Sequence, residues 1–157
     1  MFKKFAIATL LSVSHAAHSV LDYGNVTSSI KGVTPSYDQQ VENKKAIEAA
    51  INAANADQTG DRTFLVPKGT KIETMPLDVR DLKDVTIDIQ GDILATSLWE
   101  QWPIGKKAYI NFWEFTDCDG LTFQSNKERS GKIDGQGYMW WIREILQKNK
   151  SHRPRLI

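Results

Sequence analysis

Two short patterns occur twice in this chain at nearly the same interval, and this near-repeat limits the folds it can adopt. Asp-Val-Thr-Ile at 84–87 is matched 36 residues later by Gly-Leu-Thr-Phe at 120–123. Gly-Asp-Ile at 91–93 is matched 40 residues later by Gly-Lys-Ile at 131–133. Repeats of about 20–45 residues are typical of solenoids, in which successive turns of the chain stack on one another. The extra residues of the second interval fall in the polar stretch 124–130, as a loop insertion would.

The segments between these repeats predict strands. Residues 85–89 alternate apolar and polar, which places Val85, Ile87 and Ile89 on the inner face of a strand. Other strands are expected at 64–66, at 93–94 after Gly91, at 111–115, at 121–123 and around Ile133. Residues 63–135 then make about two to three turns of a solenoid.

A helix is expected before the strands, from Tyr37 to Asn55. Ser36 followed by Gln39 fits a capping box, with Asp38 as an alternative N-cap. An apolar stripe at helical spacing runs along it: Ile47, Ala50, Ile51 and Ala54, with Val41 a further candidate. A stack of strands needs its first layer covered, so the helix is expected to cap the N-terminal end.

The segment at 131–141 carries the most specific motif of the chain. It reads Gly-Lys-Ile-Asp-Gly-Gln-Gly-Tyr-Met-Trp-Trp, which predicts a short strand, a tight turn at Gly135 and Gly137, and a helix from Tyr138 to Lys148. It resembles the Gly-x-Ile-Asp-Gly-x-Gly-x-x-Trp-Trp signature of the polygalacturonase-like glycoside hydrolases, family 28, which have the pectin-lyase-like β-helix fold. The sequences at 64–69, 82–95 and 153–157 look like that family's first-turn strand, second turn and the Arg-Pro start of the next strand.

This resemblance covers roughly residues 22–157 and implies a mainly β fold: an N-terminal capping helix followed by the first two to three turns of a right-handed parallel β-helix. It implies a secreted glycosidase that hydrolyses pectin-like polysaccharide through carboxylates and water. The family's Asn-Thr-Asp, Asp-Asp, Gly-His-Gly and Arg-Ile-Lys motifs do not occur in the 157 residues. No catalytic residue is therefore assigned, and we expect the N-terminal portion of such an enzyme. The alternatives are a non-catalytic carbohydrate-binding or decayed β-helix module and, more weakly, a lyase of the same fold.

Two tryptophans are the candidate sugar-binding residues. Trp99 and Trp102 could form a flat platform against a sugar ring, or could instead hold a long loop against the strands. Lys106 and Lys107 suit an acidic sugar, although a surface lysine pair is usually only solvated.

The acidic residues and the single cysteine offer little chemistry. Asp117 and Asp119 could share one face of a strand, but they more simply bracket a turn before Leu121, helped by Gly120. Asp88 and Asp92 are interpreted as outward strand and turn positions, and Cys118 as a small buried residue. Without a His cluster or a Cys pair, no metal and no cofactor are expected.

The N-terminus has the features of a secretory signal peptide at 1–16. Lys3 and Lys4 precede a short apolar stretch and small residues at 14–16, so the mature domain is expected at 17–157, outside the cell. Asn25 and Asn149 lie in glycosylation sequons. A net charge of +1 without a basic run argues against a nucleic-acid partner. The expected partner is a polysaccharide, with no membrane in the mature form and a monomeric state.

Overall fold

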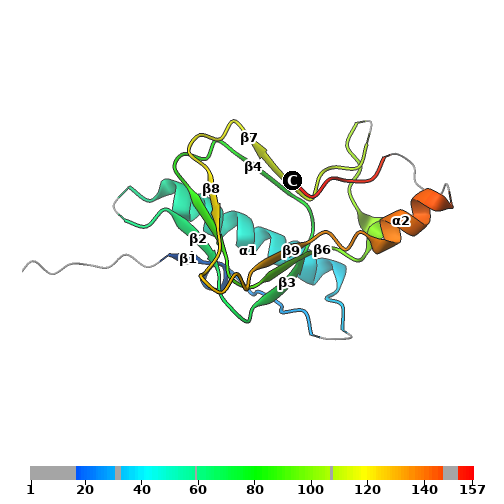
Figure 1. The fold of residues 1–157 in the computed structure, drawn as a ribbon, viewed down its shortest axis with the longest axis horizontal. Coiled ribbons are helices and arrows are strands. Elements are labelled where there is room, and N and C mark those ends of the chain that lie inside the picture. Colours follow the sequence, from blue (N-terminus) through cyan, green and yellow to red (C-terminus); the bar gives the residue numbers. More distant parts are fainter. Residues whose placement is uncertain (1–16, 31–32, 59, 107, 147–151) are drawn as a thin grey trace, which may run out of the picture.

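The computed structural model describes residues 17–30, 33–58, 60–106, 108–146 and 152–157. These residues form short strands, two α-helices and two 3-10 helices (Figure 1). In chain order the elements are β1 (His18–Ser19), η1 (Val20–Asp22), α1 (Tyr37–Ala56), β2 (Thr63–Val66), β3 (Lys71–Thr74), β4 (Leu77–Arg80), β5 (Thr86–Ile89), β6 (Asp92–Ala95), η2 (Trp99–Gln101), β7 (Trp113–Thr116), β8 (Thr122–Gln124), β9 (Lys132–Asp134) and α2 (Tyr138–Ile145).

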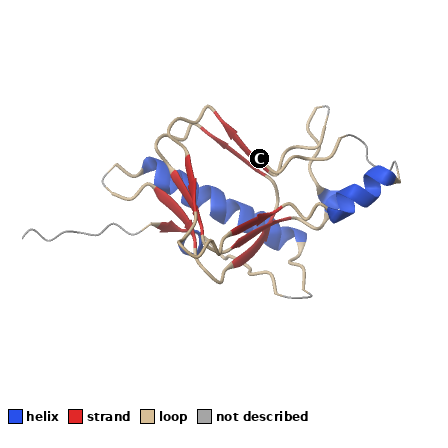
Figure 2. Cartoon of the chain, viewed as in Figure 1, coloured by secondary structure: helices blue, strands red, loops and turns tan. Residues whose placement is uncertain are grey.

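The named strands pair in parallel and belong to three sheets, with orders β1-β2-β5-β8, β3-β6-β9 and β4-β7. The chain passes through one strand of each sheet in turn, β2 to β3 to β4, and then returns to the first sheet beside its earlier strand. Figure 2 shows the strands along three sides of the molecule, with α1 behind them. The fold is therefore rich in parallel strands, as expected.

The register of the strands confirms the sequence repeat. β5 pairs β8 with Ile87 opposite Phe123, and β6 pairs β9 with Ile93 opposite Ile133. These are the 36- and 40-residue intervals. The extra residues lie at 125–131, between β8 and β9, where only two residues separate β5 from β6. The predicted loop insertion is therefore correct.

Three strands were not expected from the sequence: β1, which has only two residues, and β3 and β4. Lys71–Thr74 contains one apolar residue, Ile72, so its sequence shows no alternation, although Glu73 and Thr74 are buried as well. Leu77–Arg80 does alternate, but Met75 and Pro76 precede it and mask the pattern. The expected strand at 111–115 begins two residues later, at Trp113.

Helix α1 begins and covers the stack as predicted. Ser36 Oγ accepts from Gln39 N at 3.3 Å, and Gln39 Oε1 accepts from Ser36 N at 2.8 Å, which completes the capping box. The predicted stripe is buried, and the helix packs on the first strands of all three sheets, β1, β2, β3 and β4. Of the expected apolar positions, Val41 is only half-buried.

Asn43, a polar residue of α1 outside the predicted apolar stripe, links the helix to the lead-in segment and to β3. The Asn43 side chain is buried, and its Nδ2 donates to Thr27 O and to Glu73 O, both at 2.9 Å. Its Oδ1 accepts from Thr27 N at 2.7 Å. One amide thus fastens the lead-in segment and β3 to the helix, so it remains hydrogen-bonded despite its burial.

The inner face of the stack is apolar. Val85, Ile87 and Ile89 are buried, as predicted. Asp88 alternates with them on the outer face of β5, yet neighbouring side chains cover it: its Oδ2 accepts from Gln90 Nε2 at 2.9 Å and from Gln124 Nε2 at 3.3 Å.

A turn of the same conformation joins the third sheet to the first in successive layers. Asp81 and Asp84 have positive φ, 56° and 50°, and their equivalents 36 residues later, Asp117 and Gly120, have φ of 54° and 68°. Asp84 N donates to Asp119 O at 2.8 Å across the two turns. The turn interpretation of Asp117 and Asp119 is therefore correct.

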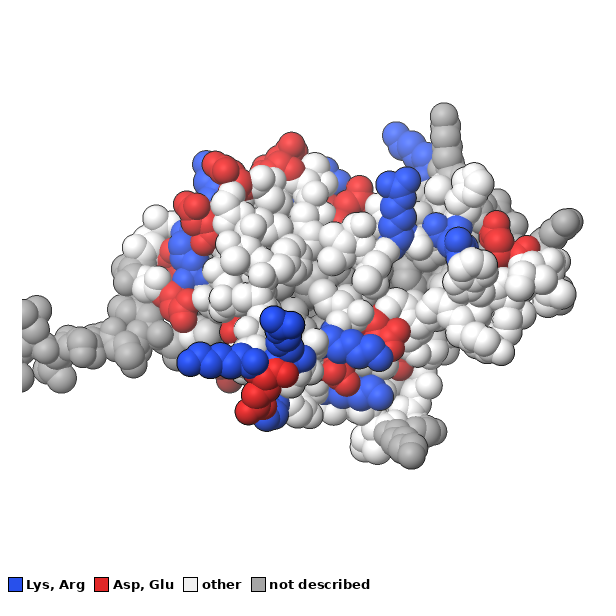
Figure 3. Space-filling model, viewed as in Figure 1, with Lys and Arg blue, Asp and Glu red and all other residues white. Residues whose placement is uncertain are grey.

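The two ends of the stack differ. The end facing away from the viewer in Figure 1 is covered by α1, whereas β8 and β9 are the outermost strands at the near end. The middle of this near face carries no Lys, Arg, Asp or Glu, and charged side chains lie along its borders (Figure 3). We call it the open end.

Candidate functional site

A tight turn after β9 places the paired tryptophans. Asp134 Oδ1 accepts from Gln136 N at 2.9 Å, Gln136 has a φ of 46°, and its amide Nε2 donates to Ala95 O. The sequence suggested that Gly135 or Gly137 would have the positive φ of this turn. In the structure, Gln136 has it instead. At Gly135 a Cβ would lie 3.1 Å from Leu156 Cδ1, a close contact that the exposed leucine side chain can relieve by a small movement.

The first tryptophan of the pair, Trp140, packs into an aromatic cluster with residues from the β6–β7 connection. Its ring lies 5.4 Å from Trp102, edge to face, and 4.8 Å from Tyr109. Trp102 also lies 6.3 Å from Phe112 and donates from Nε1 to Ile110 O at 2.9 Å. The cluster anchors α2 to the long connection.

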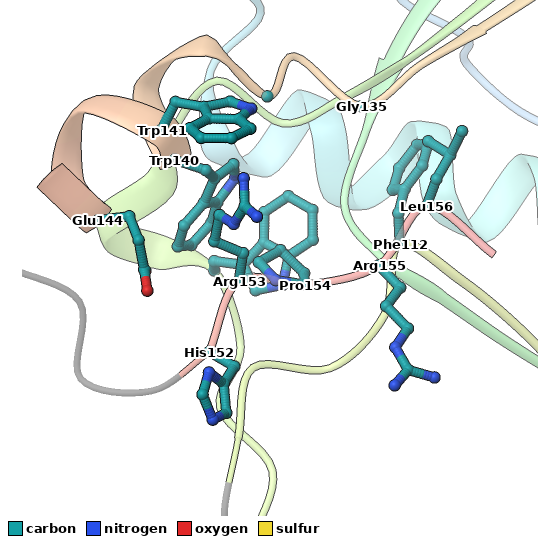
Figure 4. Close-up of a pocket in the computed structure, with 12 residues that line it drawn as sticks. Phe112, Gly135, Trp140, Trp141, Glu144, His152, Arg153, Pro154, Arg155 and Leu156 are labelled. Carbon is teal, nitrogen blue, oxygen red and sulfur yellow. The ribbon is translucent and has the colours of Figure 1, made fainter.

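A pocket of about 440 Å³ lies between α2 and residues 152–156 (Figure 4). Phe112 N donates to Arg155 O at 2.9 Å and Trp113 N to Leu156 O at 3.1 Å, which fixes this segment beside the start of β7. The expected Arg-Pro start of a strand is therefore extended and hydrogen-bonded, although it is not itself a named strand.

The second tryptophan of the pair, Trp141, forms one wall of the pocket. It is 59% exposed, and the Arg153 guanidinium carbon lies 4.3 Å from the centre of its ring. In Figure 4 the Arg153 side chain points toward the tryptophans, while those of Arg155 and His152 extend away from the pocket. An aromatic face and a cation thus meet at a surface open to solvent.

A second hollow of about 440 Å³ shares Gly137 with this pocket, and both polar and apolar groups line it. Its walls include Thr96, Ser97, Asp134 and Tyr138. The hydrogen bond from Lys132 Nζ at 2.7 Å, and then the backbone N–H of Gln136, lower the pKa of Asp134. Asp134 is therefore a hydrogen-bond acceptor at neutral pH and not a proton donor.

The sequence singled out two other tryptophans as a sugar platform, and the structure gives them other roles. Trp102 is 3% exposed and offers no open face, because the aromatic cluster surrounds it. Trp99 is half-buried, and the Arg143 guanidinium carbon lies 3.6 Å from its ring centre. The alternative interpretation, that both rings hold the long connection in place, agrees with this packing.

The exposed tryptophan and its arginine were missed because the sequence shows only a pair of adjacent tryptophans. On a helix, neighbouring residues point about 100° apart, so one ring of the pair can face the core while the other faces solvent. Which one does so depends on Tyr109 and Trp102, whose position the sequence does not reveal.

Of the remaining predicted residues, those that the structure describes do not line the pocket. Asn25 is exposed in the lead-in segment, while Asn149 and Lys107 fall outside the described residues. Lys106 is exposed. Cys118 is half-buried against the core and donates from Sγ to Thr116 O at 3.4 Å.

Two kinds of site are not found in the part of the chain that the structure describes. It has no group of three or more His, Cys, Asp or Glu side chains placed to bind a metal ion. No helix in that part of the chain has the length and apolar character needed to cross a membrane.

Comparison with known proteins gives no match: no family model, no curated protein and no solved structure corresponds to this chain.

Proposed function

We propose that the chain forms the N-terminal turns of a right-handed parallel β-helix of the polygalacturonase-like type. Three parallel sheets entered in rotation, intervals of 36 and 40 residues between paired strands, and a helix across one end support this proposal. The turn after β9 and the paired tryptophans at the start of α2 both lie within the motif that carries the resemblance.

We further propose that the pocket beside α2 binds an acidic, pectin-type polysaccharide, with secretion as the route by which the protein meets it. The observation that carries this function is the Arg153 guanidinium over the exposed ring of Trp141, in a pocket of sugar-sized volume. An aromatic face packs against the C–H face of a sugar ring, and a guanidinium forms paired hydrogen bonds with a carboxylate.

The proposed role of this pocket is binding and not hydrolysis. Glycoside hydrolysis needs two carboxyl groups on either side of one bond, about 5 Å or about 6.5–9.5 Å apart. Among the described residues that line the pocket, Glu144 is the one carboxylate. The hydrolase reaction implied by the resemblance would therefore need carboxylates from other parts of a family member.

Binding to polygalacturonate tests the proposal. Titration calorimetry with oligogalacturonates should give a binding signal that Trp141→Ala and Arg153→Ala each weaken by about tenfold or more, since each removes one of the two groups. Arg155→Ala is the matched control, because this neighbouring arginine extends away from the pocket and its removal should leave the affinity unchanged.

The chemical nature of the sugar is tested with a methyl-esterified oligogalacturonate. It keeps the ring faces but removes the charge, so it should bind wild type weakly and Arg153→Ala equally weakly. No binding to the acidic oligosaccharide, or binding that Trp141→Ala and Arg153→Ala do not alter, would refute the assigned site.

A further inference from the structure

The second hollow adjoins the pocket in which we place the acidic sugar. Gly137 lines both, and even a Cβ added at this glycine would meet nothing within 4 Å. The hollow and the pocket have similar volumes, each about 440 Å³. A saccharide chain with one unit in the pocket can therefore place the next unit in the hollow.

An exposed aromatic ring lines each of these two spaces. Tyr138 lines the hollow and is 75% exposed, and Trp141 lines the pocket. The two residues are three positions apart on α2, so they lie on the same side of the helix, about 5–6 Å apart between their Cβ atoms. Two neighbouring rings suit successive units of one saccharide chain, because each sugar ring has an apolar C–H face.

Hydrogen bonds hold the walls of the hollow in place. Gln136 Nε2 donates to Ala95 O, which joins the turn after β9 to the end of β6. Ser97 N donates to the buried carboxylate of Glu73, at 2.7 Å from its Oε1. Ser97 is itself exposed, and its hydroxyl can both donate and accept hydrogen bonds. The hollow thus has fixed walls before any ligand enters.

The charge of the hollow is opposite to that which Arg153 gives the pocket. Asp134 contributes a carboxylate, and no lysine or arginine is among the described residues that line the hollow. Lys132 binds Asp134 at 2.7 Å and offsets part of its charge, but Lys132 does not line the hollow. A carboxylate accepts hydrogen bonds from sugar hydroxyls and repels a second carboxylate.

The hollow lies on the side of the stack. Ile133 packs against the core, so its neighbours in β9, Lys132 and Asp134, lie on the outer face of the sheet. A further strand paired with β9 would extend this face and would not cover it. Helix α2 likewise lies to one side of the strands (Figure 1). A further turn of the β-helix would therefore leave the hollow open.

We propose that the hollow binds an uncharged sugar unit next to the uronate in the pocket. The protein then prefers saccharides in which uncharged units separate the free carboxylates. This inference rests on the proposed function and adds which unit lies beside the acidic one. A methyl-esterified uronate and a neutral sugar share the required chemistry, because each has hydroxyl groups and a C–H face but no charge.

Titration calorimetry with disaccharides tests the proposal. The ligands are digalacturonate, its two forms with a single methyl ester, and galacturonate linked to a neutral sugar. At least one of the uncharged-unit ligands should bind about threefold more tightly than digalacturonate, since repulsion by a partly screened carboxylate is modest. Whether the ester or the neutral sugar gains more identifies the source of the uncharged unit.

Three variants assign this preference to the hollow. Asp134→Asn keeps the shape of the side chain but removes its charge, so digalacturonate should then bind as tightly as the preferred ligand. Asp92→Asn is the matched control, because Asp92 lies opposite Lys132 in the preceding layer and does not line the hollow, and it should keep the preference. Tyr138→Ala should weaken the binding of every disaccharide by about threefold or more.

Galacturonate alone separates this inference from the proposed function. A single sugar occupies only the pocket, so Trp141→Ala and Arg153→Ala should weaken its binding, whereas Tyr138→Ala should not. If those two pocket variants bind galacturonate as wild type does, the proposed function fails. If they bind it more weakly, the inference about the hollow is overturned by any of three results: equal binding of all disaccharides to wild type, a preference that survives Asp134→Asn, or disaccharide binding that Tyr138→Ala does not change.

Discussion

The two ends of the strand stack differ in how well their apolar residues are covered. At the capped end, α1 buries Ile47 and Ile51 completely against the first strands, and Asn43 bonds the lead-in segment and β3 to the helix. At the open end, the strand β8 is exposed along its whole length, and Phe123 is 44% exposed. Equivalent positions in the repeat therefore contribute unequally to stability.

This contrast indicates that the contribution of a repeated residue to stability depends on its layer in the stack more than on its residue type. Phe64, Ile87 and Phe123 form one column of residues, one each from the strands β2, β5 and β8 of the first sheet. The column is fully buried in the first and second layers and half open in the third. Identical substitutions along such a column measure the difference between the ends.

The largest expected effect is Phe64→Ala. Phe64 is fully buried, so its removal leaves a cavity and should lower the free energy of unfolding by about 3–5 kcal/mol. Phe123→Ala removes the same atoms from a ring held mainly by Phe115 at 5.4 Å and should cost about 1 kcal/mol. Urea unfolding followed by circular dichroism measures both. Equal losses would show that the open end is as well packed as the capped end.

Two equivalent corner glycines, Gly91 and Gly131, test whether the backbone is equally constrained in the second and third layers. A Cβ at Gly91 would collide with Thr70 O and Pro67 O, which belong to the first turn and cannot move without disturbing β3. Gly91→Ala should therefore cost about 1–3 kcal/mol of unfolding free energy.

Gly131 is the equivalent corner in the last layer, and there a Cβ would lie 1.6 Å from Ile89 O, a closer approach than either contact at Gly91. Because Ile89 O belongs to the backbone of β5, β9 must move away from β6 to relieve it, so Gly131→Ala should cost at least as much as Gly91→Ala. A loss at Gly131 well below that at Gly91, in the same urea titration, would show that the open end yields more easily than the first turn.

The sequence predicted the capped end and the layer intervals well, because both depend on local patterns. Ser36 and Gln39 are three residues apart and form their box within one helical turn. The repeat at 84–87 and 120–123 corresponds to strands that pair directly. Such features need no knowledge of distant parts of the chain.

The candidate pocket could not be predicted because it depends on contacts between distant segments. Trp102 and Trp140 are 38 positions apart in the sequence, and their rings meet edge to face. This contact buries both rings and holds α2, which carries Trp140, against the β6–β7 connection. The sequence alone gave no reason to prefer Trp141 over Trp102 as the exposed ring. The segment with Arg153 is located by the hydrogen bond from Phe112 N to Arg155 O, which no local pattern encodes.

Substitutions at the N-caps of α1 and α2 should differ less in their effect on stability. Ser36 accepts a hydrogen bond from Gln39 N, so Ser36→Ala should lower the free energy of unfolding by about 1 kcal/mol. Gly137 begins α2 without a side-chain hydrogen bond, and a Cβ there has nothing within 4 Å, so Gly137→Ala should change stability by less than about 0.5 kcal/mol. Thermal unfolding of both variants gives the comparison, and a larger loss at Gly137 would be inconsistent with the observed caps.

The smallest expected effect is an opposite response of the two ends to acid. Burial raises the pKa of Glu48, on α1, above its ordinary value of 4.5, although Lys44 acts against this. The folded state then binds a proton more readily than the unfolded state, so stability rises as pH falls through this raised pKa. At the open end, the hydrogen bond from Lys132 lowers the pKa of Asp134 below 3.8, and the stability it contributes is lost as pH falls below that value.

Unfolding free energies of wild type, Glu48→Gln and Asp134→Asn from pH 7 to pH 2.5 separate the two groups. Relative to wild type, Glu48→Gln should lose stability as pH falls through the region just above 4.5, since the wild-type carboxyl gains stability there and the amide does not. Asp134→Asn should be less stable than wild type at neutral pH, and the gap should close below pH 3.8. Because both side chains are partly exposed, each difference should stay below about 0.5 kcal/mol. Differences of the same sign for the two variants across the whole range would show that the ends do not differ in this way.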